Sequence, residues 1–112
     1  MKFKFAIPLE NGVLCSHFGH CQQFAIIDVE NNAIVGENLI TPPPHEPGLL
    51  PGWLAERGVT DVIAGGMGQR ALDLFAAQNI KVNVGAQPKS SRDLVSDWLK
   101  NSLETGTNAC DH

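Results

Sequence analysis

The chain has 112 residues, a formal net charge of −4 and 43% hydrophobic residues. This length predicts one domain, and the hydrophobic fraction is enough for one core. No cluster of Lys or Arg stands out and no apolar run is long enough to span a bilayer, so we expect neither nucleic acid nor membrane as a partner. The N-terminus lacks a signal-peptide pattern, which predicts a cytoplasmic protein. Three cysteines in a reducing compartment favour free thiols or metal ligands over disulfides.

The N-terminal half predicts three strands. Lys2–Pro8 alternates and then becomes continuously apolar, and the strand should end near Pro8 because proline cannot donate to a sheet ladder. Glu10-Asn11-Gly12 signals a turn. Asn31 and Asn32 favour a tight turn between two further strands, since asparagine tolerates positive φ. Those strands are expected over Phe24–Val29 and Ala33–Ile40, and a proline-rich loop follows at 42–48.

The C-terminal half alternates helices with strands, which predicts parallel strand pairs joined by right-handed crossovers. Gly58 should stop the first helix, and Ser90 or Ser91 should cap the last. The expected helices are Leu49–Arg57, Gln69–Gln78 and Lys89–Leu103, and the expected strands are Val59–Ala64 and Ile80–Val84. The whole order predicts an α/β fold with a mixed five-stranded sheet and helices on both faces. We expect one domain over residues 1–103 and a flexible C-terminal tail over residues 104–112.

Two thiols and two imidazoles lie within the seven residues from Cys15 to Cys21. Thiolate and imidazole are ligands for zinc, Cu(I), iron or an iron–sulfur surface. The spacing differs from the Cys-x-x-Cys of zinc knuckles, and a structural alternative stays open. Cysteine is often a small buried hydrophobe, and a loop histidine often bonds only a backbone carbonyl. The candidate metal ligands here are Cys15, His17 and Cys21.

Three glycines occur within four residues at Gly65-Gly66-Met67-Gly68, between an apolar strand and a helix. Glycine permits close backbone approach, and the N-terminus of the following helix offers unpaired N–H groups to an anion. The pattern matches neither a dinucleotide-binding fingerprint nor a P-loop. The alternative is a turn that needs glycine only to pack the helix on the sheet.

Two further candidates are less well defined by their surroundings. Three prolines precede His45 and would hold it in place, although an exposed loop histidine is an equal alternative. Cys110 and His112 would complete a tetrahedral metal site with Cys15 and Cys21 if the tail folds back. The loop after the first strand and the glycine turn both follow carboxyl ends of parallel strands, so we expect them to border one crevice.

Several segments resemble the dinitrogenase iron-molybdenum cofactor biosynthesis family. They are Ser16-His17-Phe18-Gly19 with Phe24, the stretches 47–54 and 58–68, and Ala71 and Phe75 before Ile80. The resemblance spans roughly Phe3–Leu103. It implies a ribonuclease-H-like three-layer α/β/α sandwich. It also implies binding of a metal–sulfur cofactor near the His-Phe-Gly loop, with His17 as the first candidate ligand.

The family likeness implies a binding or carrier protein that is not an enzyme. Such a protein exchanges a molybdenum–iron–sulfur-type cofactor, or its precursor, with donor and acceptor proteins, and we expect a monomer or weak dimer. The candidate cofactor-binding residues are Ser16, His17, Phe18, Gly19, Cys21, His45, Gly65, Gly66, Met67 and Gly68. A sensor that binds a small anion or nucleotide at the glycine turn is the alternative. Nuclease activity is disfavoured, because the expected strands carry too few carboxylates for two Mg²⁺ ions.

Overall fold

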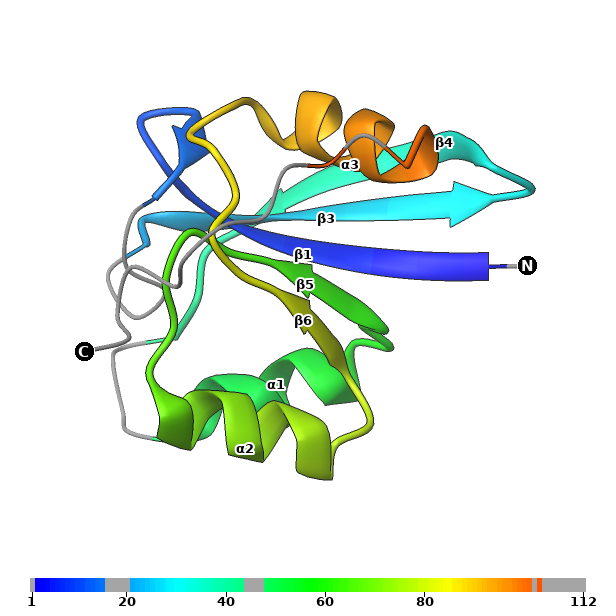
Figure 1. Cartoon of the computed structure of the whole chain (residues 1–112). Coiled ribbons are helices and arrows are strands. Elements are labelled where there is room, and N and C mark those ends of the chain that lie inside the picture. Colours follow the sequence, from blue (N-terminus) through cyan, green and yellow to red (C-terminus); the bar gives the residue numbers. More distant parts are fainter. Residues whose placement is uncertain (1, 16–20, 44–47, 102, 104–112) are drawn as a thin grey trace.

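The computed structural model describes residues 2–15, 21–43, 48–101 and 103. Over these residues the chain forms a six-stranded mixed sheet and three helices (Figure 1). The elements are β1 (Lys2–Glu10), β2 (Val13–Leu14), β3 (Gln23–Glu30), β4 (Ala33–Ile40), α1 (Leu49–Glu56), β5 (Asp61–Ile63), α2 (Gln69–Ala77), β6 (Lys81–Asn83) and α3 (Ser91–Leu99). The predicted α/β class is confirmed, and the predicted number of five strands is wrong. The tail predicted over residues 104–112 lies outside the described residues.

The sheet combines an antiparallel half with a parallel half. Its order is β4-β3-β1-β5-β6, and β2 pairs with β1 away from this path. β1, β3 and β4 are antiparallel neighbours, so the three strands predicted for the N-terminal half form a meander. β5 runs parallel to both β1 and β6, as the alternation of helices and strands predicts.

β1 continues two residues past Pro8, so the strand ends near this proline, as predicted, but not at it. The Pro8 carbonyl accepts a hydrogen bond from the Cys15 amide at 3.0 Å. In a strand, the nitrogen and carbonyl of one residue point to the same side. The missing N–H of Pro8 therefore faces the side where β5 has already ended at Ile63, and the ladder with β3 on the other side is intact.

The extra strand, β2, follows a tight turn. Asn11 and Gly12 both have positive φ, at 54° and 84°, which suits a two-residue hairpin turn. The chain therefore returns along β1, where Leu14 pairs with Leu9, instead of entering a loop directly. The predicted turn is correct, but the strand after it is too short to show a period of two in the sequence.

Helices cover both faces of the sheet (Figure 1). α3 covers one face, where Phe5 and Ile7 of β1 pack with Leu94 and Val95. α1 and α2 cover the other face, where the core includes Ala6, Phe24, Leu54 and Phe75. Neighbouring residues of β1 thus enter opposite cores, and each fully buried large side chain contributes about 1.5–3 kcal/mol to stability.

Local chemistry sets the element boundaries. Gly58, at φ 80°, ends α1 as predicted, and Ser90 caps α3 by accepting a hydrogen bond from the Asp93 amide. β5 and β6 start later than predicted because the amides of Val59 and Ile80 bond back to the preceding helices, at Leu54 and Phe75. α3 is likewise shorter than predicted at both ends. None of the described helices is long and apolar enough to cross a membrane.

Candidate functional site

The structure places only part of the predicted site. Cys15, Cys21 and the glycine turn at 65–68 lie within the described residues. The other candidates lie outside the described residues, and their roles stay predictions. These are Ser16, His17, Phe18, Gly19, His45, Cys110 and His112.

The glycine turn and the chain segment that begins at Cys15 lie at the same edge of the sheet. β1 and β5 are parallel neighbours, with Ala6 opposite Val62, so their carboxyl ends point the same way. The turn at 65–68 follows β5, and Cys15 follows the β1–β2 hairpin (left side of Figure 1). The backbone of the turn is anchored to the segment after β6, since the Gly85 amide donates to the Gly65 carbonyl at 3.0 Å.

Backbone hydrogen bonds hold both ends of the segment 16–20 at β1. The Cys15 amide donates to the Pro8 carbonyl at 3.0 Å, and the Gln22 amide donates to the Leu9 carbonyl at 2.8 Å. Cys15 continues β2 on one side of β1, and Gln22 leads into β3 on the other side. Cys15 and Gln22, which lie on either side of the predicted ligand His17 in the sequence, are therefore held beside two consecutive residues of the central strand.

Cys21 belongs to the face covered by α1 and α2. Pro8 pairs with Phe24, whose side chain lies in that core. Cys21 packs against the same core, and so does Met67 of the glycine turn, which is only 1% exposed. Cys21 and the glycine turn therefore pack at the same hydrophobic core.

Cys15 and Cys21 form a thiol pair. Both are free cysteines; Cys15 is buried, at 4% exposed, and Cys21 is half-buried. A hydrogen bond with the Cys15 side chain, then burial, then the charge of Cys15 raise the pKa of the Cys21 thiol far above its usual range. Cys21 is therefore protonated at neutral pH, and it must release a proton before its sulfur can bind a metal.

The glycine turn contains one glycine that the described structure does not require. Gly68 precedes α2 with φ −67° and ψ 157°, a conformation open to any residue. A Cβ at Gly68 would meet nothing within 4 Å. The turn presents the amino end of α2, whose first turn holds no acidic residue. The interpretation that glycine serves only helix packing therefore does not account for Gly68.

Within the described residues, no three His, Cys, Asp or Glu side chains converge on a possible metal position. The protein donors available there are the two thiols of Cys15 and Cys21. Any further ligand must come from residues outside the described set, such as His17, or from the bound group itself.

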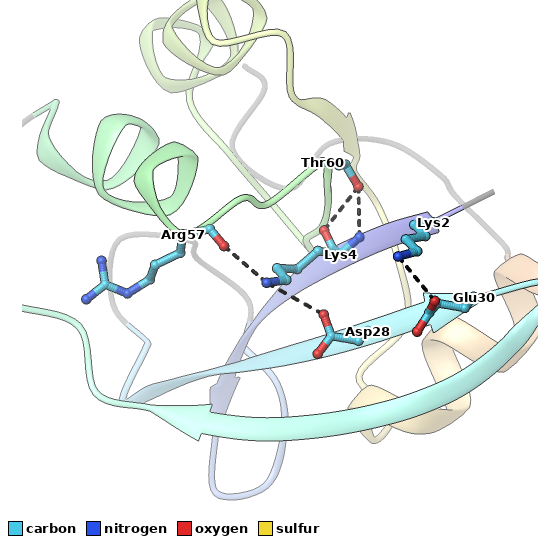
Figure 2. Close-up of polar contacts among 6 residues, drawn as sticks. All are labelled: Lys2, Lys4, Asp28, Glu30, Arg57 and Thr60. Carbon is cyan, nitrogen blue, oxygen red and sulfur yellow. Dashed lines mark hydrogen bonds and ion pairs between the residues drawn. The ribbon is translucent and has the colours of Figure 1, made fainter.

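A polar cluster at the opposite edge of the sheet was not predicted from the sequence (Figure 2). Lys4 Nζ lies 3.7 Å from Asp28 Oδ1 and donates to the Arg57 carbonyl at 3.3 Å, and Lys2 Nζ lies 3.5 Å from Glu30 Oε1. Lys2, Lys4, Asp28 and Glu30 line a cavity of about 550 Å³ beside the amino end of β1. Each lysine faces a carboxylate, so the cluster contains charges of both signs. The cluster joins β1, β3 and the end of α1.

A family model and one relative each match most of this chain. A family model described as dinitrogenase iron-molybdenum cofactor matches residues 1–101. An uncharacterised protein of Methanocaldococcus jannaschii is 31% identical over 106 residues, which cover 90% of this chain and 89% of the relative.

Solved structures show the same fold. The crystal structure of PH0822 matches with a TM-score of 0.88 and 24% identity over 100% of both chains. The apo form of the orange protein from Desulfovibrio gigas matches with a TM-score of 0.74 and 20% identity, over 94% of this chain and 93% of that one.

Proposed function

The chain belongs to the dinitrogenase iron-molybdenum cofactor family, and we propose that it binds or carries a metal–sulfur cofactor of the iron-molybdenum type, or its precursor. The cofactor is cargo, received from a donor protein and passed to an acceptor protein in the cytoplasm, and the chain catalyses no reaction on it. The family likeness also supports a ribonuclease-H-like description of the fold. The observation that best supports the proposal is the shared sheet edge of the thiol pair and the glycine turn.

The donor set suits such a cargo. Thiolates are soft ligands that prefer iron–sulfur centres, Cu(I) and zinc over hard cations. Open space at Gly68 leaves room beside the amino end of α2, where backbone N–H groups favour an anionic group such as a sulfide-rich cofactor. In this proposal Cys15 and Cys21 bind metal, the backbone of the glycine turn binds the anionic surface, and His17 adds an imidazole.

A small number of protein ligands agrees with a carrier role. A structural zinc site uses four protein ligands and is closed to exchange. Two described thiols, together with one predicted histidine, leave coordination positions for ligands of the cargo or of a partner. Transfer to an acceptor protein then requires few bonds to this chain to break.

The test compares two glycine-to-alanine variants. Gly68→Ala places a methyl group in the space assigned to the cofactor, whereas Gly52→Ala places the same group in open space within α1. Each protein is loaded anaerobically with a molybdenum–sulfur or iron–sulfur cofactor, and bound metal is measured by elemental analysis. We expect Gly68→Ala to bind at least several-fold less metal at an unchanged melting temperature, and Gly52→Ala to bind as wild type does. Wild-type protein that retains no metal would refute the proposal.

A small-anion sensor is the second candidate, and the amino end of α2 without an acidic residue in its first turn favours it. This function needs neither thiol. Calorimetry with inorganic phosphate distinguishes the two functions. Phosphate binding that is weakened by Gly68→Ala but unchanged in a double variant of Cys15→Ala and Cys21→Ala would favour the sensor.

A further inference from the structure

We propose that Cys15 and Cys21 form a reversible disulfide, and that only the reduced pair binds a soft metal centre. The proposal concerns regulation of the site described above. The statement that only the reduced pair binds a metal centre rests on the proposed function, whereas formation of the disulfide does not. The pair would make uptake of cargo depend on the surrounding thiol–disulfide balance.

The first support is the placement of the two side chains. They are hydrogen-bonded to each other although five residues separate them in the chain. Backbone bonds to Pro8 and Leu9 bring both ends of the segment to the same part of β1. Both cysteines lie outside the strands; the amide of Cys15 bonds to β1, and on the Cys21 side the amide of Gln22 does so.

The second support is the ease of closing the bond. A disulfide requires sulfurs about 2.05 Å apart and Cα atoms within roughly 4.4–6.8 Å. Adjustment of Cys21 toward Cys15 needs no break in the ladder between β1 and β3, which starts at Gln23. The sheet therefore holds the two thiols side by side, with backbone bonds to β1 at Cys15 and at Gln22.

Exposure determines the order of the chemical steps. Cys21 is half-buried and Cys15 is buried, so a small disulfide such as oxidised glutathione reaches Cys21 first. The Cys21 thiol loses its proton and its sulfur attacks the small disulfide, which releases one glutathione thiolate and leaves a mixed disulfide on Cys21. Cys15 then loses its proton and attacks the Cys21 sulfur, which releases the second glutathione. Two electrons pass from the cysteines to glutathione, and the two protons end on the two glutathione thiols.

Oxidation would remove both ligands in one event. Metal binding requires thiolate sulfur, and neither sulfur of a disulfide retains that form. The covalent ring would also enclose the segment that carries His17, the predicted third ligand. Reduction by excess thiol reverses the bond and restores both donors.

The first experiment tests the disulfide alone. Full-length Cys110→Ser protein, which lacks the third cysteine, is equilibrated anaerobically with mixtures of reduced and oxidised glutathione, then alkylated and analysed by mass spectrometry. We expect Cys15 and Cys21 to become protected together, with the loss of two hydrogens, in one two-electron transition that dithiothreitol reverses. Full alkylation of both cysteines at every ratio, or accumulation of only a glutathione adduct on Cys21, would overturn the proposal.

The second experiment tests the effect on binding. Cd²⁺ alone serves as a thiolate-seeking probe, and its binding is followed by ultraviolet charge-transfer absorption and calorimetry. We expect the reduced protein to bind at least ten-fold more tightly than the oxidised protein, and a Cys21→Ser variant to show no difference between the two conditions. Equal binding by both wild-type states would overturn the proposal. Loading with a metal–sulfur cofactor is measured in parallel, so that its failure counts against the carrier function and leaves the thiol result standing.

Discussion

The Cys15 side chain is hydrogen-bonded to Cys21, and this contact is the largest cause of the raised pKa of the Cys21 thiol. The hydrogen bond forms because β2 returns Cys15 to β1 beside the position where β3 begins. Two thiols that are separated by five residues in the sequence therefore form one hydrogen-bonded pair in the fold.

Cys15→Ala should increase the reactivity of Cys21. The substitution removes the hydrogen bond and the charge of Cys15, two of the three causes that raise the Cys21 pKa, while burial remains. The pKa then falls part of the way toward its usual range, and a larger fraction of thiolate is present at pH 8. Alkylation of Cys21 by iodoacetamide, measured by mass spectrometry in a Cys110→Ser background, should become faster. Identical pH profiles with and without Cys15 would show that the two thiols are not coupled.

Folding stability should fall at alkaline pH, partly through Cys21. Its pKa is raised in the folded protein, so the unfolded chain loses the proton first. The stabilising contribution is complete below the unfolded-state pKa of about 8.5 and decreases as pH rises above it. Under reducing conditions, the melting temperature of wild type should decline more steeply between pH 8.5 and about 10 than that of Cys21→Ser. Parallel curves for the two proteins would contradict this assignment.

His17→Ala should weaken binding of a metal–sulfur cofactor and leave the fold nearly intact, because His17 is predicted as a ligand and not as a core residue. Neutral imidazole, with an unperturbed pKa of about 6.5, is a competent ligand near neutral pH. Phe18→Ala is the contrasting variant, predicted to lower stability by about 3–5 kcal/mol as a loss of packing. Bound metal and melting temperature are measured for both after anaerobic loading. Equal metal content in wild type and His17→Ala would exclude the ligand role.

Thr60→Val should destabilise the edge of the sheet opposite the glycine turn. The Thr60 hydroxyl donates to Asp61 Oδ1 at 2.6 Å and accepts from the Lys4 amide at 2.9 Å, and Asp61 is only 3% exposed (Figure 2 shows the link to Lys4). Valine has a similar shape but leaves the buried carboxylate without this donor, which costs about 1–2 kcal/mol. Thr60→Ser keeps the hydroxyl and should stay within about 0.5 kcal/mol of wild type. Urea unfolding measures both, and equal losses in the two variants would contradict the role of the hydroxyl.

Local features were predictable because their causes lie within a few residues. Asn31 and Asn32 adopt positive φ in the turn between β3 and β4, as expected of asparagine. The stop at Gly58 and the cap at Ser90 depend only on backbone conformation and one neighbouring side chain. The alternation of helices with strands in the C-terminal half likewise predicted the parallel strand pairs.

The sequence proposes the candidate site as a set of residue types, and the expectation that its two loops border one crevice stays a prediction. Cysteine, histidine and glycine at 15–21 and 65–68 indicated soft-metal and anion chemistry from composition alone. Nothing in the sequence indicated that Gly68 has open space beside it while Met67 is buried, since both facts depend on how α2 packs against the sheet. The polar cluster around Lys4 was missed for a similar reason, because its members come from strands and turns far apart in the chain.

Sequence periodicity, turn residues and caps therefore determine the elements and their order, since each depends on interactions within one turn or strand. Hydrogen-bond pairing between distant segments determined the features that no local pattern predicts. Pro8 stays inside β1 because its missing N–H faces the side where β5 has ended, a fact that no local pattern contains. The same pairing brings Cys15 and Cys21 together, because the carbonyls of Pro8 and Leu9 accept hydrogen bonds from chain segments on opposite sides of one strand.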